Sequence, residues 1–259
     1  MSAASIELDL TPATQYLLRI GDSCLILAQR ISEWAGHAPV LEEDIAMANI
    51  ALDLIGQTRA VLSLAGQMEG RGHDEDQLAF LRQERDYFNV TLTELPRGDF
   101  AFSVLRNAMV STWLKLLWAQ LAESSSNEEL RAIAAKALKE ARYHQQHSAD
   151  WVVRLGDGTG ESRQRMEKAL GDLWRYANEL FDTDAADVAA AEQGMGPLWS
   201  ALKLPWQQEI QLMLDEATLV VPAESKFISD GKRGRHSEHM GFILADMQYL
   251  QRAYPGGAW

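Results

Sequence analysis

Two carboxylates of this sequence, Asp53 and Glu140, lie in the middle of long amphipathic segments, where an acid facing the interior can bind a metal ion. Four-helix di-iron proteins place a Glu-x-x-His motif on each of two helices, because residues three apart share one helix face. The third residue after Asp53 is Gly56, and the third residue after Glu140 is Tyr143. Neither supplies the nitrogen ligand of a histidine, so both motifs are incomplete.

A symmetric di-iron bundle also needs one carboxylate on each of two further helices. In an antiparallel helical hairpin, residues equally far from the loop lie at a similar depth, so reflection through the loop locates these positions. Reflection of Asp53 gives Asp22, whereas reflection of Glu140 gives Val110, next to Ser111. The set therefore keeps three carboxylates but lacks both histidines and one acid, and we expect it to bind no iron.

Acids in apolar surroundings need partners, because an unpaired buried charge is costly. Nearby residues could supply these partners: Arg19 for Asp22, Asn49 and Gln57 for Asp53, and Arg142 and His144 for Glu140. We therefore expect a polar network in the space of a former metal site; the alternatives are half-exposed acids and a single-metal site. If Asp53 is buried and paired, Asp53→Ala should cost about 3 to 5 kcal/mol of stability.

A second metal constellation is offered by Glu140, His144 and His147, which share one helix face. Three such groups can hold zinc if another element completes the coordination shell. The carboxylate precedes both histidines, unlike the order in His-Glu-x-x-His, and Gln145 and Gln146 lie beside them. A polar surface stripe is the favoured interpretation.

Basic and aromatic residues suggest where a partner could bind. The single basic cluster of this acidic chain consists of Lys232, Arg233 and Arg235. It could bind a phosphate or an acidic protein surface, or it could be a solvated loop. Aromatic residues are enriched in interfaces, and three tryptophans lie in or beside irregular segments: Trp199, Trp206 and Trp259. His236, before the last helix, is expected to face solvent or to cap that helix.

Apolar residues recur at intervals of three and four along most of the chain, which predicts helices nearly everywhere. We expect an all-α fold, with residues 1–259 as one domain and a four-helix core of two hairpins, about 14–68 and 99–155. Residues 90–93 are a candidate extended segment. Accessory helices are expected at about 162–181, 205–219 and 237–254.

Composition narrows the classes of partner. The chain has 259 residues, of which 47% are hydrophobic, and its net charge of −13 argues against nucleic acid or an anionic membrane as the main partner. The single cysteine, Cys24, excludes an intrachain disulfide. The sequence shows no signal-peptide pattern and no uninterrupted apolar run of about 18 residues, so we expect a cytoplasmic protein.

Four long stretches carry a resemblance to a known family: RIGDSCLILAQRISEWAGHAPVLEEDIAMANIALDLIGQTR, KALKEARYHQQHSADWVVRLGDGT, LWRYANELFD and GKRGRHSEHMGFILADMQYLQR. They closely resemble the non-catalytic, ferritin-like subunits of ring-1,2-phenylacetyl-CoA epoxidases, multicomponent monooxygenases of aerobic phenylacetate breakdown. The resemblance covers essentially the whole chain. It implies a ferritin-like fold and a structural role without catalytic residues.

The resemblance also implies partners and cofactors. A homologous catalytic subunit is expected to hold the di-iron centre and the CoA thioester, and a reductase with FAD and an iron–sulfur cluster to deliver electrons from NADPH. No cofactor is expected in this chain, which could form a homodimer when alone. Two alternatives remain: an independent metal-dependent helical-bundle oxidase, and a ferritin-like storage or binding protein.

Overall fold

The computed structural model describes residues 5–257, and their regular structure is helical apart from one isolated bridge between Asp230 and Arg235. The all-α prediction is confirmed. The α-helices of the described residues are α1 (Pro12–Ser32), α2 (Leu41–Glu69), α3 (Glu75–Phe80), α4 (Thr91–Glu94), α5 (Phe100–Ser124), α6 (Glu128–Gly156), α7 (Gly160–Trp174), α8 (Ala185–Glu192), α9 (Lys203–Glu216), α10 (His239–Met247) and α11 (Tyr249–Ala253). Four short 3-10 helices are η1 (Glu84–Asp86), η2 (Ala177–Phe181), η3 (Trp199–Leu202) and η4 (Gly231–Arg233).

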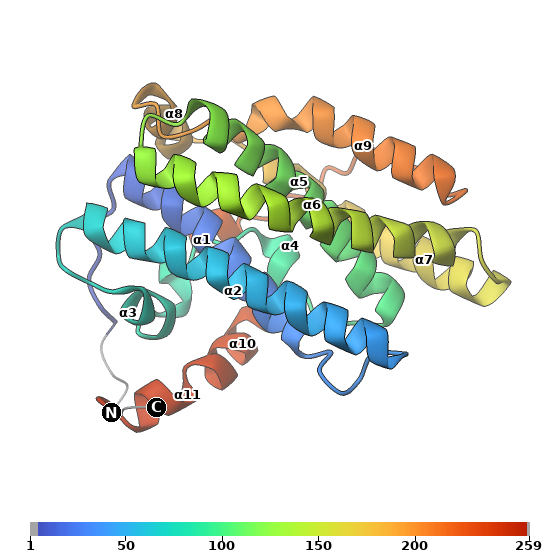
Figure 1. Cartoon of the computed structure of the whole chain (residues 1–259), viewed down its shortest axis with the longest axis horizontal. Helices are drawn as coiled ribbons and strands as arrows, with labels where there is room; N and C mark the ends of the chain where they lie inside the picture. Colours follow the sequence, from blue (N-terminus) through green and yellow to red (C-terminus); the bar gives the residue numbers. More distant parts are fainter. Residues whose placement is uncertain (1–4, 258–259) are drawn as a thin grey trace.

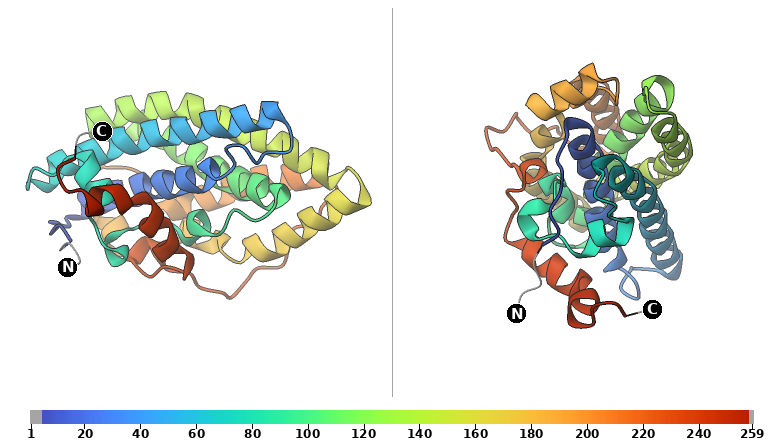
Figure 2. Two further views of the ribbon diagram at one scale, coloured as in Figure 1. Left: turned by 90° about the horizontal axis from the view of Figure 1, so that it is seen from below. Right: turned by 90° about the vertical axis from the view of Figure 1, so that its left-hand side faces the viewer.

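Two antiparallel hairpins, α1–α2 and α5–α6, form the core of the molecule (Figure 1). The helices α2 and α6 pack beside each other and form one outer layer, while α1 and α5 lie behind them (Figures 1 and 2). The α7 and α9 helices pack against the α5–α6 hairpin, and α8 packs against α1. These hairpins correspond to the segments expected at 14–68 and 99–155.

Local sequence signals explain where the core helices begin and end. The carboxylate of Asp99 accepts a hydrogen bond from the backbone N–H of Phe102 at 2.9 Å, which caps α5. Gly70 ends α2 with a φ of 78°, a left-handed conformation that favours glycine. Near that end, a Cβ on Gly66 would lie 2.0 Å from the carbonyl oxygen of His73, so only glycine allows this close approach.

Three segments differ from the sequence expectation because tertiary contacts override local propensity. Residues 90–93 are not extended: Thr91 begins the short helix α4, and its N–H donates to Glu179 Oε2 at 3.0 Å. The segment 162–181 is not one helix, because α7 ends at Trp174 and η2 follows. The last expected helix is divided at Gln248, whose side chain donates to the carbonyl oxygen of Arg82 at 2.9 Å.

The helix α2 is, among the described helices, the one that is long and apolar enough to cross a membrane by length and composition alone. A core helix of a soluble protein passes the same test, and 44% of the most apolar window of α2 is buried within this chain. Because α2 packs along α1 and α6, the bundle explains the apolar residues on the inner side of this helix.

Candidate metal site

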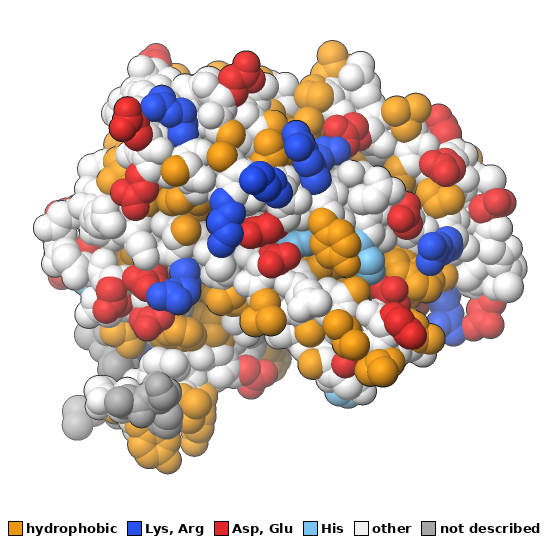
Figure 3. Space-filling view, in the orientation of Figure 1, with side chains coloured by type: hydrophobic (Ala, Val, Ile, Leu, Met, Phe, Trp, Pro, Cys, Tyr) orange, Lys and Arg blue, Asp and Glu red, His pale blue; other side chains and the backbone are white. Residues whose placement is uncertain are grey.

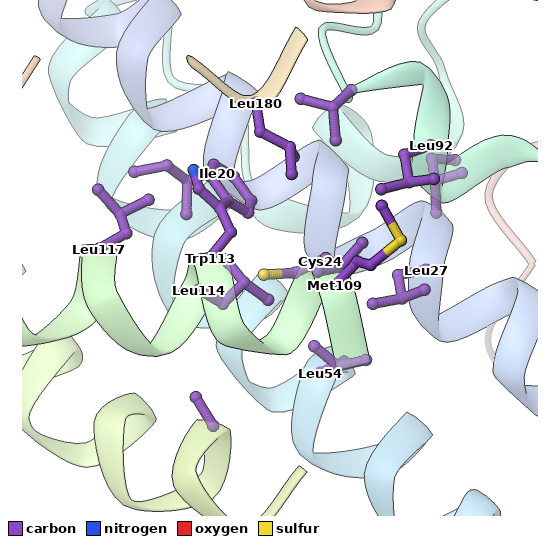
Figure 4. Close-up of a cluster of buried hydrophobic side chains, with 14 of the residues drawn as sticks. Ile20, Cys24, Leu27, Leu54, Leu92, Met109, Trp113, Leu114, Leu117 and Leu180 are labelled. Atoms are coloured by element: carbon purple, nitrogen blue, oxygen red, sulfur yellow. The ribbon is translucent and has the colours of Figure 1, made fainter. Parts of the chain in front are cut away.

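The centre of the bundle is apolar. Ile20 and Cys24 from α1, Leu54 from α2 and Leu114 from α5 converge there, and each is at most 1% exposed (Figure 4). Burial raises the pKa of the Cys24 thiol, which is therefore neutral at physiological pH. Within residues 5–257, no group of three or more His, Cys, Asp or Glu side chains could hold a metal ion. The donors that a di-iron centre requires are absent from this centre within the described residues. The expected polar network is present only as a short chain at its edge: Cys24 Sγ donates to Gln57 Oε1 at 3.8 Å, and Gln57 donates to Glu140.

Asp22 is fully buried, and its partner is Arg82, which follows α3. Arg82 Nη2 contacts Asp22 Oδ1, Arg82 Nη1 donates to Asp22 Oδ2 at 2.9 Å, and the N–H of Phe88 donates to the same oxygen at 2.8 Å. The expected partner Arg19 instead pairs with Asp184 and Asp187. Although burial opposes the charge of Arg82, Asp22 raises the pKa of its guanidinium. Asp22 is thus a charge-paired structural residue.

Asp53 lies at the seam between α2 and α6, and its side chain is 39% exposed. Its Oδ2 atom is 3.0 Å from Nε2 of His144, a residue that is 2% exposed. Burial lowers the pKa of His144 and outweighs the opposing effect of Asp53, which favours a neutral ring. The neutral ring donates to the carboxylate of Asp53, so the pair links two helices without burying two charges.

Glu140 is only partly buried, with 20% of its side chain exposed. Gln57 Nε2 donates to Glu140 Oε2 at 3.0 Å, so Gln57 is a partner of Glu140 and not of Asp53. Lys136 Nζ lies 3.7 Å from Glu140 Oε1, one turn away on α6. Glu140 therefore belongs to the seam between α2 and α6 rather than to the centre of the bundle.

The other reflected positions do not face a common centre. Ser111 is buried, and its hydroxyl donates to the carbonyl oxygen of Asn107 at 2.5 Å within α5. Gly56 is exposed, and Tyr143 is 51% exposed on the outside of α6. Reflection through a loop gives the depth of a residue but not its direction around the helix. The buried residues of α2 include Met47, Ile50, Leu54, Gln57 and Val61, a register that turns Asp53 and Gly56 away from the interior.

The zinc alternative fails because its three groups have separate partners. His144 contacts Asp53, Glu140 accepts from Gln57, and Nε2 of His147 is 2.8 Å from Glu43 Oε2. The expectation of a polar surface stripe is also incorrect, because His144 is buried and the side chain of His147 is 11% exposed. These three contacts join α6 to α2.

Most of the proposed contact residues are held inside the chain. Lys232 is fully buried, and its Nζ donates to Asp187 Oδ2 at 2.8 Å. Arg233 pairs with three carboxylates, those of Asp182, Asp184 and Asp230. The cations of this loop therefore neutralise acids of the same chain, which removes Lys232 and Arg233 as candidates for an anion-binding or acidic-partner site. Arg235 remains exposed, with 82% of its side chain accessible.

Two of the three tryptophans expected at an interface are buried in the structure. Trp199 is fully buried and packs edge-on against Tyr16 and Trp113, with the Lys232 ammonium above its ring. Trp206 is 1% exposed, and its indole N–H donates to the carbonyl oxygen of Met109 at 2.9 Å. Neither ring can contact a partner in this conformation. Trp259 lies outside the described residues.

His236 is neither solvent-facing nor a helix cap. Its Nδ1 is 2.7 Å from Glu94 Oε2 and its Nε2 is 3.0 Å from the carbonyl oxygen of Tyr87, and the side chain is fully buried. Both neighbours are acceptors, so only the protonated ring can donate to both. Burial opposes protonation, but Glu94 outweighs it and raises the pKa of His236. Sequence reasoning missed this contact because Glu94 lies on a distant helix.

We expect this contact to stabilise the fold most at low pH. A raised folded-state pKa means that the native chain holds the proton more tightly than the unfolded chain, whose histidine pKa is about 6.5. The stabilisation is complete below that value and is lost as the pH rises through the folded-state pKa of His236. The difference in unfolding free energy between wild type and His236→Gln should therefore shrink as pH increases, measured by urea unfolding. A difference that grows with pH would contradict a protonated His236. The pKa of His144 is lowered, so a contribution from His144 alone would grow with pH.

Asp53→Ala is expected to cost only about 0.5 to 1.5 kcal/mol, the contribution of one hydrogen bond. The larger cost expected from the sequence assumed a buried Asp53, but 39% of its side chain is exposed and its partner His144 can remain neutral. Denaturant unfolding of Asp53→Ala and Asp53→Asn measures the cost, with the amide variant closer to wild type. A loss above about 3 kcal/mol would instead indicate a buried ion pair.

The geometry defines a class of protein: a ferritin-like helical bundle whose centre is filled with apolar side chains instead of metal ligands. Residues 1–259 match the family model described as phenylacetic acid catabolic protein, and the chain belongs to this family. A similar protein is a component of 1,2-phenylacetyl-CoA epoxidase from Escherichia coli strain K12, the subunit that bears the letter C. The two chains are 49% identical over 246 residues, which cover 95% of this chain and 98% of that subunit. The resemblance inferred from the sequence is confirmed.

Proposed function

We propose that this chain is a non-catalytic, structural subunit of a cytoplasmic phenylacetyl-CoA epoxidase that acts in aerobic phenylacetate breakdown. The near full-length similarity to one subunit of the Escherichia coli enzyme supports membership of such a complex. The observation that carries the structural role is the apolar centre of the bundle, where Ile20, Cys24, Leu54 and Leu114 leave no set of di-iron ligands. The described residues therefore favour the structural role over an independent metal-dependent oxidase or an iron-storage protein.

The proposed division of labour places the chemistry in other subunits. A homologous bundle holds the di-iron centre and the CoA thioester, and a reductase carries FAD and an iron–sulfur cluster and takes electrons from NADPH. A di-iron bundle must keep charged ligands in its core, which opposes tight packing. A second bundle without such ligands can pack a continuous apolar core and give rigid support to the first.

Co-expression with the other epoxidase subunits of the same organism tests membership of the complex. The chain should co-purify with the catalytic subunit in a fixed ratio, measured by native mass spectrometry. A di-iron protein contains about two iron ions per chain. Elemental analysis of this chain purified alone should find far less iron than that. Stoichiometric iron in the isolated chain would contradict the structural role, and separate elution of all subunits would contradict membership of the complex.

A further inference from the structure

The outward surface of α2 and α6 combines exposed apolar and basic side chains (Figure 3). We call this surface the α2–α6 face. Its aliphatic stripe consists of Leu41, Ile45 and Leu52 on α2, and its basic row consists of Lys136, Lys139 and Arg142 on α6. None of the other described helices covers the outer side of this layer (Figure 1).

The three side chains of the aliphatic stripe are all largely exposed to solvent. Leu41 is 71% exposed, Ile45 54% and Leu52 67%, and they recur on one side of α2 at intervals of four and seven. On α6, Tyr143 adds an aromatic ring that is 51% exposed. Isolated exposed apolar residues are common, whereas several on adjoining helices are typical of a protein-contact surface.

The basic row is unusual in a chain with a net charge of −13. Lys136 has 77% of its side chain exposed, and its ion pair with Glu140 is a loose contact at 3.7 Å. The side chains of Lys139 and Arg142 have no hydrogen-bond or ion-pair partner within the described residues. The loop cations Lys232 and Arg233, in contrast, are neutralised inside the fold. The three cations of the basic row are therefore available to the carboxylates of a binding partner.

The seam under this face is already ordered. The contacts Gln57–Glu140, His144–Asp53 and His147–Glu43 join the two helices at three successive levels, with distances of 3.0, 3.0 and 2.8 Å. A face that is ordered before binding loses less conformational entropy on association.

We propose that the α2–α6 face binds a helical surface of another epoxidase subunit, one that presents carboxylates to the basic row and apolar side chains to the aliphatic stripe. The identity of this occupant rests on the proposed function. The acids Glu42, Glu43 and Asp53 lie within the same layer and repel phosphate-rich surfaces, so the mixed charge fits a protein better than a membrane. Complementary charge fixes the register of the two helical surfaces, while the aliphatic contacts supply most of the buried apolar area.

The first test reverses the charge of the basic row. The triple variant Lys136→Glu, Lys139→Glu, Arg142→Glu is co-expressed with the other epoxidase subunits, and the Kd of the complex is measured by mass photometry against wild type. The control variant reverses three exposed cations elsewhere: Arg165→Glu, Lys168→Glu and Lys226→Glu. We expect the basic-row variant to bind at least about ten-fold more weakly and the control to match wild type. Equal behaviour of the two variants would overturn the proposal.

The second test uses a pair of leucines with the same exposure. Leu52→Asp places a charge on the aliphatic stripe, and Leu212→Asp does so on α9, where Leu212 is 69% exposed against 67% for Leu52. Because both side chains already face solvent, both variants should fold, as circular dichroism checks. Only Leu52→Asp should weaken the complex, again by at least about ten-fold. A loss of binding in Leu212→Asp alone would place the interface on α9 and overturn the proposal.

The outcomes separate this proposal from the proposed function. If wild type fails to assemble with the epoxidase subunits, the proposed function is wrong, and the α2–α6 face has no proposed binding partner. If wild type and both α2–α6 variants assemble equally well, only the surface assignment fails. Vesicles containing phosphatidylserine provide the last arm: wild type should not sediment with them, and sedimentation that the basic-row variant abolishes would assign the face to a membrane and overturn the proposal.

Discussion

Leaving this chain out of a reconstituted phenylacetyl-CoA epoxidase is expected to lower NADPH-dependent epoxide formation by at least about ten-fold, which corresponds to about 1.4 kcal/mol of activation free energy. The expected reason is structural, because the catalytic bundle would lose its supporting partner and become insoluble or poorly formed. Product formation by the catalytic subunit and the reductase is followed with and without this chain. A soluble catalytic subunit that runs at full rate without it would contradict the structural role.

The matched control is a variant that leaves the chain present. His144→Ala removes a side chain of the former metal-candidate set, which contacts Asp53 across the helix seam. If the variant folds and assembles normally, turnover should stay near the wild-type rate. A folded, assembled His144→Ala complex without turnover would show that this chain carries chemistry of its own.

Arg82→Leu is expected to lower the free energy of unfolding by about 3 to 5 kcal/mol. Both side chains of the Arg82–Asp22 pair are fully buried, so the substitution leaves the carboxylate of Asp22 without its counter-ion in the interior. The same change also removes the hydrogen bonds that Arg82 donates to the carbonyl oxygens of Leu78 and Asp86. The measurement is the unfolding free energy from urea titration, followed by circular dichroism.

A second arginine provides the control for that experiment. Arg59 also pairs with an acid, Glu75, but its side chain is 71% exposed. Arg59→Leu should therefore change the stability by no more than about 1 kcal/mol. Equal losses in the two variants would mean that burial does not decide the cost, and would contradict the role given to the Arg82–Asp22 pair.

The helices could be predicted because their signals are local. Apolar residues at intervals of three and four mark α1, α2, α5 and α6, and Gly70 and Asp99 mark a helix end and a helix start. The two core hairpins follow from the short connections between these helices. The accessory region was predicted less well, since the division at Gln248 depends on a bond to Arg82, 166 residues away in the sequence.

The candidate site could be predicted only in part. The loss of the histidines is visible in the sequence at Gly56 and Tyr143, and the apolar neighbours of Asp22 agree with its burial, although a half-exposed position was the alternative. The direction of each side chain could not be predicted, because a difference of one residue turns a helix position by about 100°. Asp53 is therefore at a seam, while its neighbour Leu54 is in the bundle centre.

Partners far away in the sequence were the main source of error. Asp22 has Arg19 within one turn, but it pairs with Arg82, 60 residues away. Trp199 and Lys232 were expected at the surface because each lies in an irregular segment, yet they are buried against each other. Irregular backbone says little about burial when other elements cover it. In each case the missing information was the tertiary arrangement and not the residue type.

The contacts of Arg19 have a consequence for the order in which the protein can be completed. Arg19 Nε donates to the carbonyl oxygen of Lys232, 213 residues later in the chain, and its Nη1 pairs with Asp187. During synthesis from the N-terminus, Arg19 of α1 therefore has no counter-ion until Asp184 and Asp187 have left the ribosome, and it lacks its last partner until Lys232 follows. If a nascent chain buries α1 before these residues are available, it must also bury the unpaired charge of Arg19, which is costly. The first of the described helices to be synthesised, α1, is thus among the last to reach its final environment.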